Sequence, residues 1–125
     1  MRALVIDDST AMRSILGRML RELGFEVLEA GNGREAIARL EALGGADLAL
    51  VDWNMPEMDG LEFVRRVRAG APRAGIRLVM VTSEVEAGRI ALALAEGADE
   101  YVMKPFNRQV LEEKLDLLGL LPSGT

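Results

Sequence analysis

Five short strand-like runs alternate with five segments of helical periodicity along this 125-residue chain. The runs cover about residues 3–6, 25–30, 48–51, 78–81 and 100–103. Runs this short are typical of strands, whereas apolar residues that recur every three or four positions indicate helices. Strict alternation of the two predicts a parallel sheet with helices on both faces. We therefore expect one α/β domain, a doubly wound (βα)5 fold around a parallel five-stranded sheet.

The charges within the strands predict their order in the sheet. The runs at residues 3–6, 48–51 and 78–81 are entirely apolar, as expected of central strands that are buried on both faces. The runs at residues 25–30 and 100–103 carry glutamates, as expected of edge strands. This division fits the order 2-1-3-4-5, which reverses direction between strands one and three. Ligands bind at such a reversal, beyond the carboxyl ends of the strands.

Composition excludes several classes of chemistry. The chain has no cysteine and no histidine, which rules out disulfides, thiol catalysis and a phosphohistidine, and removes the commonest catalytic base. Any metal must be held by oxygen, which favours Mg²⁺ or Ca²⁺ over zinc. A formal charge of −5 argues against non-specific binding to nucleic acid. No apolar run approaches the roughly 18 residues of a membrane span, and we expect a soluble, cytoplasmic protein.

Charged and hydroxyl side chains stand where the strands end. Asp7 and Asp8 close the first run, Asp52 the third, Thr82 the fourth and Lys104 the fifth. The carboxyl ends of parallel strands meet at one edge of a sheet, so these side chains are expected to converge. Taken singly, each has a plainer interpretation as a helix cap, a turn residue or a solvated lysine.

Two hydroxyl residues favour a function for the acidic pair. Ser9 and Thr10 can cap the following helix themselves, which leaves the carboxylates of Asp7 and Asp8 free for another use. Three carboxylates within about 5 Å would repel by about 3 kcal/mol per pair at an effective dielectric near 20. A bound Mg²⁺ would offset this repulsion, so the convergence of these residues with Asp52 predicts a magnesium site.

The same site predicts a reaction. A carboxylate can attack a phosphoryl group to give an acyl phosphate. That transfer depends on positioning and charge neutralisation more than on a base. We predict that Asp52 is the nucleophile, and that Mg²⁺, Lys104 and the Thr82 hydroxyl meet the phosphoryl oxygens.

These motifs resemble the signature of response-regulator receiver domains. The resemblance rests on Asp7-Asp8, Asp52, Thr82 and Lys104-Pro105 and covers about residues 4–118. The segments DWNMPEMDGL (52–61) and LEEKL (111–115) are similar, more narrowly, to the chemotaxis, CheY-like members. The order 2-1-3-4-5 is that of flavodoxin-like and CheY-like folds, so the resemblance implies the fold as well as the site.

The resemblance implies a role for each residue of the site. Asp52 is the phosphoacceptor. Asp8, Asp52 and the backbone carbonyl of Asn54 bind Mg²⁺, with Asp7 acting mainly through water. Lys104 pairs with the phosphoryl group, Thr82 hydrogen-bonds to it, and the Lys104–Pro105 peptide bond is cis, an uncommon state.

The resemblance also bears on four positions around the site. Tyr101 is similar to the aromatic residue whose ring turns inward when Thr82 moves toward the phosphate; its plainer interpretation is an edge-strand tyrosine without a switching role. Ser83 stands where the family usually has alanine or glycine, and its hydroxyl is expected to alter the lifetime of the acyl phosphate. Asn54 and Glu84 occupy positions that tune hydrolysis in the family.

The fourth helix, expected over about residues 86–96, predicts a partner surface. Its residues 90–95 are all leucine, isoleucine or alanine, so the helix is apolar all round. A helix on the outer face of a sheet is normally polar outside, unless that side also meets something. An alanine-rich helix with tolerable exposure is the alternative. The resemblance places Ile90 and Leu94 toward Tyr101, on the partner face.

The preferred function is a stand-alone receiver over residues 1–119, followed by a short tail over residues 120–125. A histidine kinase would phosphorylate it, and a protein such as the flagellar motor switch would read it, in chemotaxis. It would be a monomer, and a signalling protein that catalyses only its own phosphorylation and dephosphorylation. Two alternatives remain: a phosphorelay carrier that passes its phosphoryl group to a histidine phosphotransfer protein, and a receiver cut from a longer regulator.

Two unrelated functions fit less well. A phosphatase with an aspartyl-phosphate intermediate would have a second aspartate two residues after the nucleophile, where this chain has Asn54. A flavin-binding protein of the same topology would have a phosphate-cradling loop after the first strand. This chain has Asp7 and Asp8 there.

Overall fold

Strands and helices alternate strictly in the computed structural model, which describes residues 1–55, 57–70, 75–83 and 88–120. The elements are β1 (Arg2–Ile6), α1 (Thr10–Glu22), β2 (Glu26–Ala30), α2 (Gly33–Leu43), β3 (Leu48–Asp52), α3 (Gly60–Ala69), β4 (Arg77–Thr82), α4 (Ile90–Glu96), β5 (Glu100–Met103) and α5 (Arg108–Leu117). The predicted (βα)5 pattern is therefore confirmed. No helix in the described part of the chain is long and apolar enough to cross a lipid bilayer.

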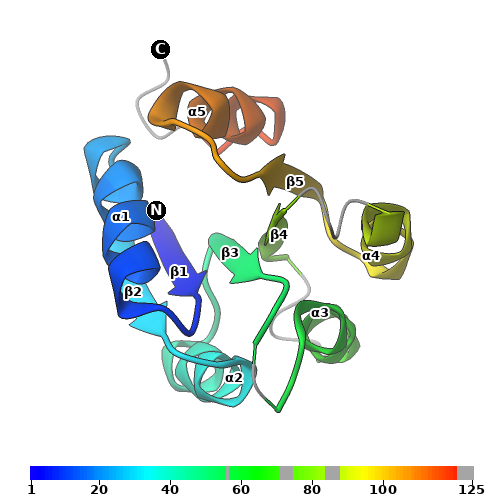
Figure 1. Ribbon diagram of the computed structural model, residues 1–125. Coiled ribbons are helices and arrows are strands. Elements are labelled where there is room, and N and C mark those ends of the chain that lie inside the picture. The colour runs from blue at the N-terminus through cyan, green and yellow to red at the C-terminus, as the bar shows by residue number, and fades with distance from the viewer. Residues whose placement is uncertain (56, 71–74, 84–87, 121–125) are drawn as a thin grey trace.

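The strands form one parallel sheet in the order β2-β1-β3-β4-β5, which confirms the predicted 2-1-3-4-5. The register pairs Ile6 with Val51 and Asp52 with Val81, so β1, β3 and β4 end close together. The helices α1 and α5 cover one face of the sheet, and α2, α3 and α4 cover the other (Figure 1). The edge positions of β2 and β5 agree with the glutamates in their sequences.

Each face of the sheet has its own apolar core. Under α1 and α5, alternate strand residues such as Leu50 and Val81 pack against Leu16 and Leu111. Under α2, α3 and α4, the core is built around Phe63 and Met80 and includes Trp53. The central strands are buried on both faces, as their apolar sequences predict. This double core fixes the strands whose ends carry the polar side chains.

Polar caps begin several of the helices. Asn32, Asp59 and Asn107 accept hydrogen bonds from the backbone N–H groups three residues on, at 2.8, 2.9 and 3.0 Å. Such caps satisfy orphan donors of the first turn. The Glu35 side chain accepts a hydrogen bond from the amide of Gly31, the residue before the N-cap of α2, at 3.3 Å.

Two element boundaries differ from the prediction. The strand β2 begins at Glu26 rather than Phe25, because the Phe25 amide donates to the Leu20 carbonyl and belongs to the end of α1. The helix α4 begins at Ile90 rather than near residue 86, and residues 84–87 lie outside the described part of the chain. Gly88 precedes α4 and disfavours a longer helix, and Arg89 gives α4 no side-chain cap.

Candidate functional site

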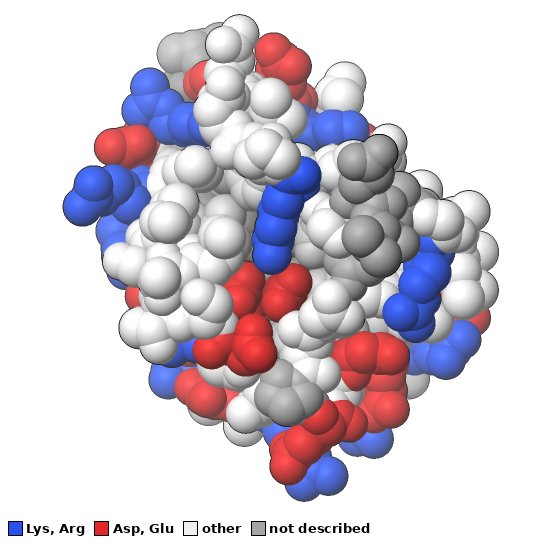
Figure 2. All heavy atoms as spheres, viewed as in Figure 1, with Lys and Arg blue, Asp and Glu red and all other residues white. Residues whose placement is uncertain are grey.

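Three carboxylates converge at the carboxyl edge of the sheet. One oxygen each from Asp7, Asp8 and Asp52 lies within 4.8 Å of the other two. The first two residues follow β1 and the third ends β3, and these strands are neighbours in the sheet. Acidic side chains gather in the middle of the face seen in Figure 2. The predicted convergence is therefore present.

The start of α1 leaves these carboxylates free of capping. Ser9 is the N-cap of α1, and its hydroxyl accepts a hydrogen bond from the Met12 amide at 3.2 Å. Asp7 Oδ1 accepts a hydrogen bond from the Ser9 amide at 2.8 Å. Asp7 Oδ2 is buried and has no hydrogen-bond partner in the part of the chain that the structure describes. A buried oxygen without a partner is costly, so this atom requires an explanation that the described protein groups do not supply.

The electrostatics of Asp52 follow from its position. Its side chain is almost fully buried, with the residue only 7% exposed. Burial and the neighbouring charge of Asp7 raise the pKa of Asp52 to about 6 from an ordinary value of 3.8. Lys104 acts in the opposite direction, and Asp8 raises the pKa further. The fold therefore holds this carboxylate at a cost in free energy, which is typical of functional sites.

Lys104 provides the positive charge at the site. Its Nζ lies 3.5 Å from Asp52 Oδ1, and its backbone amide donates to the Thr82 carbonyl at 2.7 Å. The peptide bond between Lys104 and Pro105 is cis, the state that the resemblance implies. The lysine is therefore held beside the predicted nucleophile by the end of β5.

Thr82 and Tyr101 share one face of the sheet. Thr82 is fully buried, and its hydroxyl donates to the Ser83 carbonyl at 3.3 Å. Tyr101 pairs in register with Met80, two residues before Thr82, so both side chains point to the side of α4. The Tyr101 ring is half-buried, and Lys114 Nζ lies 4.6 Å from its centroid.

The remaining predicted positions surround the site. Asn54 is exposed in the loop after β3, and Ser83 is half-buried directly after β4. Glu84 lies outside the described residues. On α4, Ile90 is 8% exposed, whereas Leu94 and Leu92 are 40% and 46% exposed. The outer side of α4 is therefore apolar as predicted, but Leu94 offers far more surface than Ile90.

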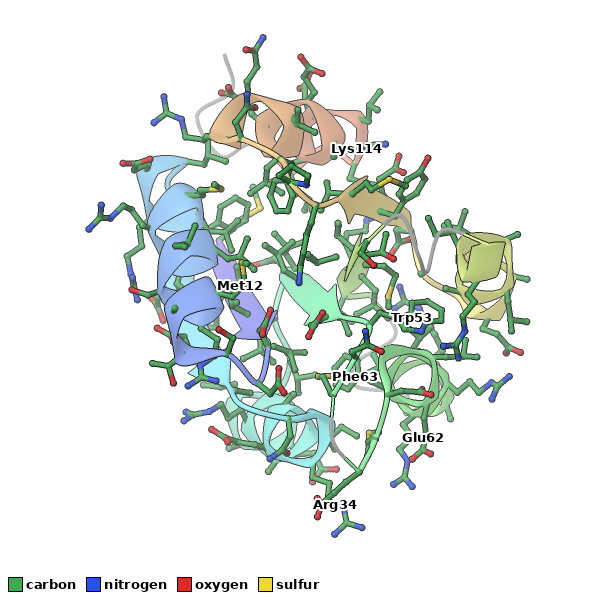
Figure 3. The ribbon with its side chains drawn as sticks, viewed as in Figure 1. Met12, Arg34, Trp53, Glu62, Phe63 and Lys114 are labelled. Carbon is green, nitrogen blue, oxygen red and sulfur yellow. The ribbon has the colours of Figure 1, made fainter. Side chains whose placement is uncertain are left out.

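Two residues near the site escaped the sequence prediction. Trp53 follows Asp52 and is fully buried between the sheet and the helices α3 and α4 (Figure 3). The Arg89 guanidinium lies 4.7 Å from the centroid of its ring and also 4.0 Å from Asp59, the N-cap of α3. Charge and periodicity do not reveal this contact from the sequence.

Arg13 is a third residue that escaped the prediction. Its Nη1 donates to the backbone carbonyl of Asp7 at 2.6 Å. A basic residue near the first turn of a helix opposes the helix dipole, so the sequence marks Arg13 as unusual but does not identify its partner. Such a residue is a candidate for a specific partner.

The donor set fits a magnesium ion. The cluster offers only oxygen atoms, the ligands that Mg²⁺ prefers, and the chain has no histidine or cysteine to favour a softer metal. Burying Asp7 Oδ2 without a hydrogen-bond partner among the described residues costs free energy, and a cation bound to this oxygen would remove that cost. The residues present therefore fit the ion.

Comparison with known proteins identifies the family. The model of the response regulator receiver domain matches residues 3–116. The chain is 43% identical over 119 residues to chemotaxis protein CheY1 of Helicobacter pylori, covering 94% of this chain and 96% of the relative. It is 45% identical over 121 residues to a chemotaxis protein CheY homolog of Campylobacter jejuni, covering 95% and 93%.

Solved structures agree with this assignment. The structure of chemotaxis protein CheY4 of Vibrio cholerae is similar with a TM-score of 0.85 and 34% sequence identity, covering 93% of this chain and 96% of that one. The fold and the sequence thus point to the same group of proteins. The chain belongs to the response regulator receiver domain family, the signalling domains of two-component systems, and its relatives include CheY-like chemotaxis regulators.

Proposed function

We propose that this protein accepts a phosphoryl group from a histidine kinase on Asp52, with Mg²⁺ bound beside it, and that the product signals in chemotaxis. One observation carries the proposal: the carboxylates of Asp7, Asp8 and Asp52 lie within 4.8 Å of one another, and Lys104 lies beside them. Three carboxylates this close repel one another, which lowers the stability of the fold. Their convergence is explained if a cation and then a phosphoryl group complete the site.

The reaction is a direct displacement at phosphorus. A carboxylate oxygen of Asp52 attacks and an O–P bond forms as the P–N bond to the kinase histidine breaks. The electron pair of the broken bond stays on the imidazole nitrogen, which takes its proton from solvent. Asp8, Asp52 and the Asn54 carbonyl would hold Mg²⁺, with Asp7 acting mainly through water. When bound, the ion would supply positive charge to offset that of the phosphoryl oxygens. The Lys104 ammonium stands 3.5 Å from the attacking group and pairs with the same oxygens.

The signal would leave the site through Thr82 and Tyr101. A phosphoryl group shifts a conformation only if it binds one state better than the other. The Thr82 hydroxyl, now bonded to the Ser83 carbonyl, is available to exchange that weak bond for a phosphoryl oxygen. Its movement would open space toward Tyr101 on the same face of the sheet. The face formed by α4, β5 and α5, with Leu94 exposed on it, is the proposed output surface.

The biological setting follows from the relatives. Those cited above are named chemotaxis proteins, which favours a reader such as the flagellar motor switch over a phosphotransfer protein. We place the protein in the cytoplasm as a monomer, with the receiver over residues 1–119 and a tail over residues 120–125. Ser83 is proposed to adjust the lifetime of the acyl phosphate, which the protein hydrolyses itself.

Labelling with acetyl phosphate tests the proposal. Acetyl phosphate and Mg²⁺ should add one phosphoryl group to the wild type, measured by intact-protein mass spectrometry, and none to Asp52→Asn. Asp116→Asn, an exposed aspartate on α5, is the matched control and should label like the wild type. Labelling that persists in Asp52→Asn, or that does not require Mg²⁺, would overturn the assignment.

A further inference from the structure

The loop between β1 and α1 carries two of the three acidic residues, and Arg13 reaches back from α1 to hold it. Arg13 Nη1 donates to the backbone carbonyl of Asp7 at 2.6 Å. The Arg13 side chain is only 18% exposed, so this bond is shielded from solvent. A hydrogen bond from a charged donor is stronger than a neutral one. The carbonyl of the residue that bears the unpartnered Oδ2 is thus fixed by an arginine from the next helix.

The guanidinium is itself oriented by two other groups. Arg13 Nε bonds Glu29 Oε1 on β2 at 3.3 Å, and Nη2 bonds Thr10 Oγ1 at 3.3 Å. Glu29 also lies 3.9 Å from Arg21 through its second oxygen. All three nitrogens of the fork are therefore used, and they join α1, β2 and the loop.

The backbone closes this arrangement on its other side. The amide of Asp7 donates to the Ala30 carbonyl at 3.2 Å, and Ala30 follows Glu29 in β2. The Asp7 residue is consequently held at its amide by β2, at its carbonyl by Arg13, and at Oδ1 by the Ser9 amide. Only Oδ2 is left unbonded, and the other three contacts determine where it points.

We propose that Arg13 is a positioning residue for the cation site: it fixes the loop so that the carboxylates of Asp7 and Asp8 meet that of Asp52. The inference rests on the proposed function, since it concerns magnesium at the same site. Partners that orient metal ligands typically contribute 10- to 100-fold to metal affinity. Arg13 acts less directly than such partners, because it bonds the backbone of Asp7 and not the carboxylate that would bind the ion.

The role depends on geometry rather than on charge. Besides burial, the neighbouring charges that move the pKa of Asp52 are those of Asp7, Lys104 and Asp8, and Arg13 is not among them. A positive charge near a cation site would also weaken binding, so its loss alone would tighten binding of Mg²⁺. The planar fork of arginine meets three acceptors at fixed angles, which the single ammonium of lysine does not reproduce.

Magnesium titration of three variants tests the proposal. Mg²⁺ alone is added to the wild type, Arg13→Gln and Arg13→Lys, and its Kd is read from the fluorescence of Trp53, the single tryptophan, and from the amide NMR shifts of Asp8. Arg18→Gln, which removes the same charge from an exposed position of α1, is the matched control. Thermal unfolding without Mg²⁺ verifies that each variant is folded at the titration temperature.

The proposal predicts a Kd raised by about tenfold in both Arg13→Gln and Arg13→Lys, with Arg18→Gln equal to the wild type. Glu29→Gln, which frees the guanidinium, should raise the Kd by a smaller factor. Wild-type affinity in Arg13→Lys would show that the planar fork of arginine is not required and would overturn the proposal. Lowered unfolding temperatures with an unchanged Kd would show a purely structural role and overturn it too. If the wild type itself fails to bind Mg²⁺, the proposed function fails first.

Discussion

Two aspartates at opposite ends of the strands have opposite electrostatic environments. Asp99 lies before β5, near the amino end of β4, and every contact around it is favourable. Its Oδ2 accepts from Arg68 at 2.7 Å and from the Leu78 amide at 2.8 Å, and Arg77 lies 3.5 Å from Oδ1. Asp52 at the other edge is more deeply buried, yet two of its nearest charged neighbours are acidic.

The difference separates a stabilising carboxylate from a reactive one. Two arginines and a backbone amide surround Asp99, which joins Arg68 of α3 to the sheet. Among the described residues, Lys104 is the one cation paired with Asp52, at 3.5 Å, and the pKa of Asp52 is raised to about 6, chiefly by burial. Carboxyl groups whose pKa is raised by burial and by like charges are typical of functional sites.

Removing Asp99 should destabilise the protein most. Asp99→Ala leaves Arg68 without its closest acceptor and the Leu78 amide without one of its bonds, at a cost of about 2–3 kcal/mol. Urea unfolding measures the loss, which should be the same with and without Mg²⁺. Asp116→Ala, on the exposed side of α5, should change stability by less than about 0.5 kcal/mol. If Mg²⁺ restored the stability lost in Asp99→Ala, the sites of Asp99 and Asp52 would not be independent.

Removing the charge of Asp52 should instead stabilise the protein, in a pH-dependent way. A carboxyl whose pKa is raised from 3.8 to about 6 holds its proton more tightly when folded than when unfolded. Stability from this group is therefore lost as pH rises through that window, by up to about 3 kcal/mol. Without Mg²⁺, Asp52→Asn should be more stable than the wild type by that amount at pH 7.5, and by little at pH 4. An equal difference at both values would refute the raised pKa.

Removing Lys104 should affect the reaction more than the metal. Lys104→Ala loses the ammonium that lies 3.5 Å from Asp52, so labelling by acetyl phosphate should slow by at least about tenfold. Binding of Mg²⁺ should persist, because the ion's ligands are unchanged. Phosphorylated Lys104→Ala should also show a weaker change in the NMR signals of the Tyr101 ring. Labelling at the wild-type rate would remove Lys104 from the mechanism.

The sequence predicts the fold and most of the site, for physical reasons. Three runs are entirely apolar and two carry glutamates, and this contrast predicts the sheet order, because central strands are buried on both faces and edge strands are not. The convergence of Asp7, Asp8 and Asp52 follows from strand order alone. The contacts of Arg13 and Arg89 cannot be predicted from the sequence, because the partners of a long side chain depend on how the helices and loops are arranged in space. The buried Ile90 was not predicted either, since α4 is apolar on every side.

The stability of Asp52→Asn relative to the wild type, measured at pH 7.5 with and without Mg²⁺, tests the central claim most directly. Without the ion, the variant should be the more stable protein by up to about 3 kcal/mol. Mg²⁺ at about 100 times its Kd should add about 2.7 kcal/mol to the wild type and far less to the variant, which has lost a ligand. The advantage of the variant should therefore almost vanish. An advantage that Mg²⁺ leaves unchanged would contradict the claim that these three carboxylates are held together for a cation.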